Sequence, residues 1–132
     1  MDYLDLRDWL VKARELGEVR DVTGATWQED IGHITEMIHH TDEGPVALFD
    51  EVPGYPKGYR IVVNANATRK RLALTLGLPL DIGRRDLMDR FLGMTEADRA
   101  IPPVVQETGP VFENVFHGDD IDIERFPTPW WH

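Results

Sequence analysis

Residues 60–79 carry the sequence pattern that most constrains the fold of this chain. The stretch begins with three consecutive β-branched residues at 61–63, and such a short apolar run is typical of a strand covered on both faces. Asn64 then favours a turn, and leucines at helical spacing follow Thr68. Gly77 supplies a left-handed helix end. The pattern therefore predicts a strand, a tight turn and a helix in succession.

The rest of the chain predicts further strands and helices that pack around this unit. A second buried strand is expected directly upstream, at residues 46–49. The other expected elements are a helix at 6–16 capped by Asp5, a strand at 18–22, helices at 27–40 and 84–92, a capped turn at 95–98, and strands at 104–105, 111–116 and 121–123. We therefore expect a single small α/β domain, with α+β as the alternative, in which helices pack on a mixed sheet of about four to six strands.

Composition limits the classes of function that fit the chain. Its 132 residues suit one domain, and the net charge of −10, with a pI near 4.8, argues against a surface for nucleic acid or for an anionic membrane. There is no cysteine, so neither a disulfide nor thiolate chemistry is available. The first residues lack the basic and apolar regions of a signal peptide, and no apolar run approaches a membrane span. We expect a cytoplasmic protein.

The helix expected at 27–40 carries a cluster that could bind a metal ion. At about 100° per residue, its core-facing residues are expected to be Ile31, Ile34, Met37 and Ile38. His33, Glu36 and His40 fall within about 60° of one another on the other side, where their side chains could converge on a metal or act as acid and base. A solvated face is the favoured interpretation, because one exposed helix face supplies no pocket and no supporting shell.

Two other stretches could bind ions. The turn at 64–71 could hold an anion at the helix N-terminus with help from Arg69 or Arg71, but it has no glycine, and simple capping is the favoured interpretation. The acidic residues at 119–124 could indicate calcium. They alternate with two isoleucines and lack the glycine and terminal glutamate of a calcium loop, so a strand with outward carboxylates is favoured.

The last seven residues, 126–132, are rich in large apolar side chains and cannot form a helix through their prolines. Trp130 and Trp131 are expected to be exposed, which is unfavourable in water. Such a tail usually continues into more protein or docks on a partner. We therefore expect a domain at 1–125 and the start of a linker at 126–132.

Several stretches occur in an order that resembles a known family. They are Leu-Asp-Leu-Arg-Asp-Trp-Leu at 4–10, Glu-Leu-Gly-Glu-Val at 15–19, Ile-Gly-His-Ile-Thr at 31–35, Pro-Val-Ala-Leu-Phe-Asp-Glu-Val at 45–52, and Phe-Pro-Thr-Pro at 126–129. Between the last two, residues 64–78 keep Asn64, Arg71, Ala73, Leu76 and Gly77 of the family's pattern, with Ala67-Thr68 where Gly-Ser is common. The ordered series covers nearly the whole chain and resembles the opening of the UbiD-type decarboxylases.

This resemblance implies a function that extends beyond the chain. Family members are longer enzymes that add or remove the carboxyl group of aromatic or α,β-unsaturated acids, and they use prenylated FMN with a divalent metal and potassium. Their catalytic and cofactor-binding residues lie in a split-barrel-like domain that would follow residue 132, and the full-length enzyme is expected to be a homo-oligomer. No residue of this chain therefore receives a catalytic, cofactor-binding or metal-binding role, and the chain alone is expected to be inactive.

Three hypotheses follow. The first is the N-terminal structural domain of such a decarboxylase, packed on the catalytic domain through Trp130, Trp131 and their neighbours. The second is a separately encoded accessory subunit that docks on a decarboxylase through the same tail. The third is a small metal-binding protein that uses His33, Glu36 and His40. We rank them in this order.

Overall fold

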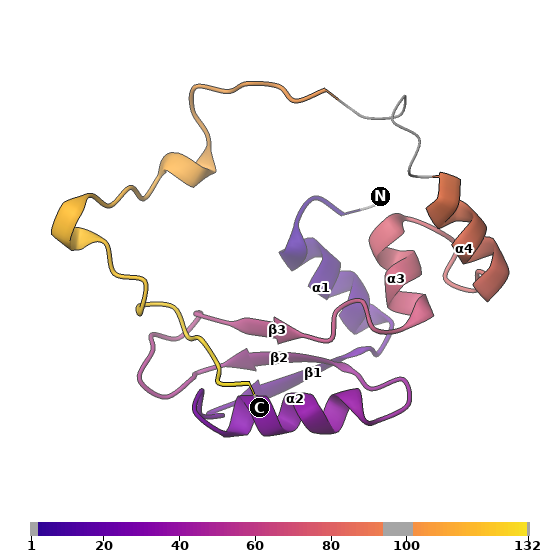
Figure 1. Cartoon of the computed structure of the whole chain (residues 1–132), viewed down its shortest axis with the longest axis horizontal. Coiled ribbons are helices and arrows are strands. Elements are labelled where there is room, and N and C mark those ends of the chain that lie inside the picture. The colour runs from indigo at the N-terminus through magenta and orange to yellow at the C-terminus, as the bar shows by residue number, and fades with distance from the viewer. Residues whose placement is uncertain (1–2, 94–101, 132) are drawn as a thin grey trace.

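The computed structural model describes residues 3–93 and 102–131 (Figure 1). Its helices are α1 (Leu6–Glu15), α2 (Asp30–His39), α3 (Arg69–Leu76) and α4 (Arg84–Gly93), and its strands are β1 (Val19–Thr23), β2 (Val46–Asp50) and β3 (Ile61–Val63). Figure 1 shows α1 and α3 on one face of the sheet and α2 on the other. The described residues therefore form three layers, which confirms the predicted α/β fold class. None of the helices in these described ranges is both long and apolar enough to cross a membrane.

The central strand of the sheet is β2. β1 pairs with it in parallel, and β3 pairs with it antiparallel. Val46 and Leu48 belong to the apolar cluster on the α1 side, whereas Ala47 and Phe49 belong to the cluster on the α2 side. All four are buried because β2 is covered on both faces, as its unbroken apolar run predicted. The sheet has three strands in the described part of the chain, fewer than the predicted four to six.

The first face of the sheet is covered mainly by α1. The Asp5 carboxylate caps this helix as predicted, because it accepts hydrogen bonds from the backbone N–H groups of Arg7 at 2.8 Å and Asp8 at 3.0 Å. Trp9 is buried, and its Nε1 donates to Thr75 Oγ1 of α3 at 3.0 Å. The helix is therefore joined to α3 as well as packed on the sheet.

The second face is covered by α2. Ile31 is fully buried, and Ile34 and Ile38 pack against the same cluster. Met37 is 70% exposed, so its predicted place on the core face is wrong. A three-stranded sheet covers only a narrow stripe of one helix. Met37 lies outside this stripe, since it is about 120° around the helix from the buried Ile31.

The turn chemistry around α3 is as the sequence predicted. Thr68 Oγ1 accepts a hydrogen bond from the Arg71 backbone N–H at 3.3 Å, and Gly77 ends the helix with a φ of 66°. The predicted helix at 84–92 is present as α4. It buries Leu87 but leaves Met88 and Leu92 exposed, so much of its apolar face lies outside the core.

Residues 102–131, here called the C-terminal segment, form an arch that extends away from the three layers and returns to the sheet beside α2 (Figure 1). The strands predicted at 104–105, 111–116 and 121–123 are wrong, because the segment contains two short 3-10 helices, Pro110–Phe112 and Gly118–Asp120, and no strand. Its apolar residues have β-propensity, but no neighbouring strand pairs with them. The capped turn predicted at 95–98 lies outside the described residues.

Candidate functional sites

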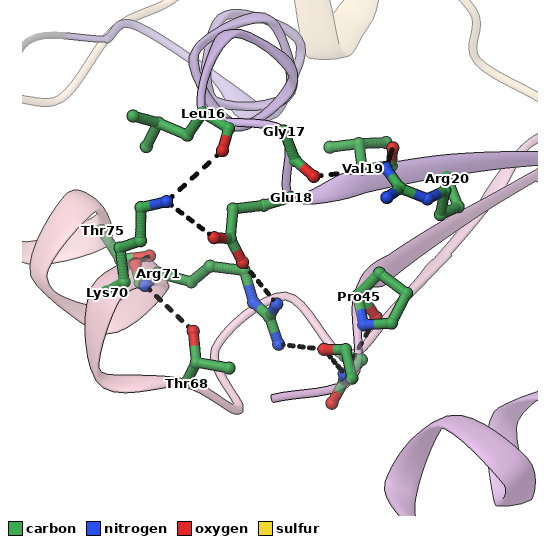
Figure 2. A network of polar contacts seen from close by, with 12 residues as sticks. Leu16, Gly17, Glu18, Val19, Arg20, Pro45, Thr68, Lys70, Arg71 and Thr75 are labelled. Carbon is green, nitrogen blue, oxygen red and sulfur yellow. Dashed lines mark hydrogen bonds and ion pairs between the residues drawn. The ribbon is translucent and has the colours of Figure 1, made fainter. Parts of the chain in front are cut away.

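Glu18 is the centre of a polar network that joins the start of β1 to α3 (Figure 2). Its Oε2 accepts a hydrogen bond from Arg71 Nη1 at 2.9 Å, and its Oε1 accepts one from Lys70 Nζ at 2.8 Å. Lys70 Nζ also donates to the Leu16 carbonyl oxygen at 3.3 Å, and Arg71 Nη2 donates to the Gly44 carbonyl oxygen at 2.8 Å. Two adjacent residues of α3 thus link this helix to two segments that are distant in sequence.

The charges of Arg71 and Glu18 are largely removed from water, whereas the Lys70 side chain is 41% exposed. The Arg71 side chain is fully buried, the Glu18 side chain is 18% exposed, and Arg71 Nε has no hydrogen-bond partner. Burial acts to raise the pKa of the Glu18 carboxyl, but the hydrogen bonds and charges of Lys70 and Arg71 outweigh burial and lower this pKa below its ordinary value. The carboxylate is therefore the counter-charge on which the buried guanidinium depends.

Asn64 extends the network to the turn before β2. It has a left-handed backbone with a φ of 63°, a conformation that asparagine tolerates better than most residues. Its Nδ2 donates to the carbonyl oxygens of Gly44 at 2.8 Å and Pro45 at 2.9 Å. Since Arg71 bonds to the same Gly44 carbonyl, both side chains fix the entry of the chain into the central strand.

These contacts decide the role of the turn at 64–71. Arg71 is engaged with Glu18 and Gly44, so its proposed use in binding an anion is wrong, and the Thr68 cap confirms the simpler interpretation. Arg69 is exposed on the first turn of α3. One feature of the sequence indicates that Arg71 faces the interior. Arg71 lies three residues before Leu74, which packs against the core, and residues at this spacing lie on the same side of a helix. Its partner lies 53 positions upstream and has no local signature.

The polar face of α2 is solvated, as favoured from the sequence. Glu36 Oε1 lies 2.9 Å from His40 Nε2, and both side chains are mostly exposed. Within residues 3–93 and 102–131, no three histidine, aspartate or glutamate side chains are placed to hold a metal ion, so His33 does not complete a site with this pair.

The acidic stretch at 119–124 does not form the predicted strand. Asp122 Oδ1 accepts a hydrogen bond from the Glu124 backbone N–H at 2.9 Å, which folds the acids into a local turn. Within residues 3–93 and 102–131 these acids, like the other acidic residues and the histidines, form no group of three placed to hold a metal ion, so the calcium alternative gains no support.

The C-terminal segment exposes a large apolar surface. The exposed side chains are those of Val104, Val105, Val111, Phe112, Val115, Phe116, Ile121, Ile123, Phe126, Trp130 and Trp131. Surfaces of this kind usually mark a site of contact with another protein surface. The predicted exposure of both terminal tryptophans is confirmed.

Two aromatic contacts hold the end of this segment on the domain. The rings of Trp27 and Trp130 lie 5.5 Å apart at 89°, and the Trp130 backbone N–H donates to the Trp27 carbonyl oxygen at 3.0 Å. The ring of Phe126 lies 5.7 Å from that of Tyr59. The segment is therefore anchored where it returns, although most of its apolar side chains stay in water.

The sequence of this chain matches that of a family of N-terminal domains. Residues 10–98 match the family described as 3-octaprenyl-4-hydroxybenzoate carboxy-lyase N-terminal domain. The chain belongs to this family, which confirms the resemblance to the UbiD-type decarboxylases. It is also 34% identical over 137 aligned residues to pyrrole-2-carboxylic acid decarboxylase of Pseudomonas aeruginosa, an alignment that covers 98% of this chain and 27% of that protein.

Solved structures of vanillic acid decarboxylase from Sedimentibacter hydroxybenzoicus share the fold. The closed form is 25% identical, with a TM-score of 0.77 over 93% of this chain and 26% of that one. An open form is 23% identical, with a TM-score of 0.63 over 72% of this chain and 20% of that one. The chain thus spans about a quarter of the length of these relatives.

Proposed function

We propose that this chain is the N-terminal structural domain of a UbiD-type non-oxidative decarboxylase. The substrate would be an aromatic or α,β-unsaturated carboxylic acid, and the catalytic part would follow residue 132. Family membership supports this proposal, as does the fact that the chain aligns with only 27% of its P. aeruginosa relative. The relatives' names specify pyrrole-2-carboxylic acid and vanillic acid, both of which are aromatic.

The observation that carries the proposal is the exposed apolar surface of the C-terminal segment. The core of residues 9–87 is already covered on both faces of the sheet, so this surface has no place inside the domain. The catalytic domain would cover this surface, with Trp130 and Trp131 at the junction between the two domains. Each Å² of apolar area buried in this way would stabilise the full-length protein by roughly 25 cal/mol. The prediction that the domain ends at residue 125 and a linker begins at 126 stays part of this proposal.

Prenylated FMN, a divalent metal and potassium are cofactors that the proposal assigns to the full-length enzyme. The residues described here do not fit such a site, because they include no group of three metal-ligating side chains and Arg71 is committed to Glu18. No catalytic step is therefore assigned to this chain. We also propose a cytoplasmic location and a homo-oligomeric full-length enzyme.

Association in trans tests the proposal. The part of the full-length polypeptide that follows residue 132 is produced separately and mixed with the 132-residue chain, and the complex is measured by light scattering. Phe112→Asp should abolish the association, because Phe112 is exposed on the C-terminal segment. Val11→Asp is the matched control, since Val11 is similarly exposed but lies on α1. Absence of any complex, or release of CO₂ from an aromatic acid by the chain alone with prenylated FMN, would overturn the proposal.

A separately encoded accessory subunit is the second candidate. The apolar clusters on both faces of the sheet support this candidate, because a domain with a complete core can fold without its partner. The intact mass of the protein from its native cells distinguishes the two candidates. A mass near 15.1 kDa would favour the subunit, and a much larger mass would favour the domain.

A further inference from the structure

An aromatic pocket lies between the C-terminal segment and the domain. Trp27 and Tyr55 line it from the domain, and Phe126 and Trp130 line it from the segment. The pocket has a volume of about 360 Å³, and the acidic residue Glu124 also lines it.

Two of the aromatic rings that line the pocket lie nearly perpendicular to each other. The rings of Trp27 and Trp130 are nearly perpendicular, at 89°, and Tyr59 packs against Phe126 from outside the pocket. Aromatic faces attract cations through their quadrupole, and tryptophan does so most strongly. A nearby carboxylate adds a full negative charge to this attraction. The composition of the wall therefore favours a cationic group over a neutral or an anionic one.

The arginine that follows Glu124 in sequence is engaged elsewhere. The Arg125 guanidinium lies 4.5 Å from the centre of the Phe116 ring. Within the described ranges no cation is paired with the Glu124 carboxylate, whose residue bonds only through its backbone N–H to Asp122. The negative charge in the pocket wall is thus left for a group from outside the chain.

We propose that this pocket receives an arginine side chain of the catalytic domain, an inference that rests on the proposed function. A planar guanidinium can stack on an indole face and at the same time bond to a carboxylate through two N–H groups. A protein surface would also cover Ile123 and the neighbouring Trp131, which a small free cation would leave in water. The arginine would hold the returning end of the C-terminal segment between two domains.

Binding of side-chain probes to the 132-residue chain tests the inference. The probes are the N-acetyl methylamides of arginine, of its neutral analogue citrulline and of leucine, and the readout is the shift of the indole N–H signals of Trp27 and Trp130 in NMR spectra. We expect the arginine probe to bind roughly two- to thirty-fold more tightly than citrulline, the range of a cation–π contact. Equal affinity for citrulline, or tighter binding of leucine, would overturn the inference.

A matched pair of variants locates the binding. Glu124→Gln should reduce the preference for arginine over citrulline, because only the aromatic faces then attract the charge, whereas Glu113→Gln, the same change of charge outside the pocket, should leave the preference unchanged. An unchanged preference in Glu124→Gln would overturn the inference. Association in trans with the catalytic domain is measured on the same proteins. If a complex forms but the preference for arginine is absent, only the inference fails, whereas the absence of any complex refutes the proposed function itself.

Discussion

Removing the charge of Glu18 should destabilise the domain far more than removing the charge of an exposed ion pair. Glu18→Gln keeps the shape and one acceptor oxygen but leaves the fully buried guanidinium of Arg71 without its counter-charge. A buried charge that loses its partner costs about 3–5 kcal/mol, and we expect about 3 because Gly44 still accepts one hydrogen bond. For a domain of this size, this cost corresponds to a fall in Tm of roughly 12–24 °C.

Urea unfolding, followed by tryptophan fluorescence to which the buried Trp9 contributes, measures this difference. Asp21→Asn is the control, since Asp21 pairs with Arg14 on the surface and its loss should cost less than about 1 kcal/mol. The double variant Glu18→Gln with Arg71→Met should recover much of the lost stability, because no buried charge is left. A cost for Glu18→Gln as small as that of Asp21→Asn, or a double variant no more stable than the single one, would refute the reasoning.

Three further predictions concern the same domain. The pKa of Glu18 is lowered in the folded state, so its contribution to stability is present above its unfolded pKa, about 4.3, and is lost as the pH falls through the folded value; acid titration of stability should therefore be shallower in Glu18→Gln than in the wild type. Gly44→Ala should lower the free energy of unfolding by roughly 1–3 kcal/mol, because the new Cβ would lie 2.3 Å from the Ile38 carbonyl oxygen. In Gly93→Ala the new Cβ meets no atom within 4 Å, so this control should be nearly neutral. Equal effects of the two variants in thermal unfolding would contradict this prediction. A chain ending at Gly93 should keep a cooperative thermal transition, because the buried core residues that the structure describes all lie before Gly93. Circular dichroism measures this transition, and a non-cooperative one would show that the C-terminal segment is needed for folding.

Several helices and strands of the domain could be predicted from residues that are adjacent in sequence. The apolar run of β2 predicted burial on both faces, and the Asp5 cap and the Gly77 end fixed helix boundaries through groups adjacent in sequence. Each of these features depends on neighbouring residues, so each can be read from a short window.

The failures concern features that depend on distant residues. Arg71 is buried because Glu18 reaches it from the start of β1, and a basic first turn on a helix gives no sign of such a partner. The apolar residues of the C-terminal segment resemble strands because they suit burial, but no strand of this chain pairs with them. The aromatic pocket was missed as well, since Trp27 and Trp130 meet across more than a hundred residues of sequence.

The early completion of the core sets an order of events during synthesis. Leu87 is the last buried core residue in the described chain, so the domain can begin to fold once that residue has left the ribosome. The 45 residues from position 88 to position 132 follow it, and at typical elongation rates they take roughly 2–9 s to emerge. During this interval the apolar residues of the C-terminal segment are in water beside a folded domain. If a catalytic domain follows as proposed, the contact of Trp130 with Trp27 would hold the growing chain close to the surface on which that domain is built.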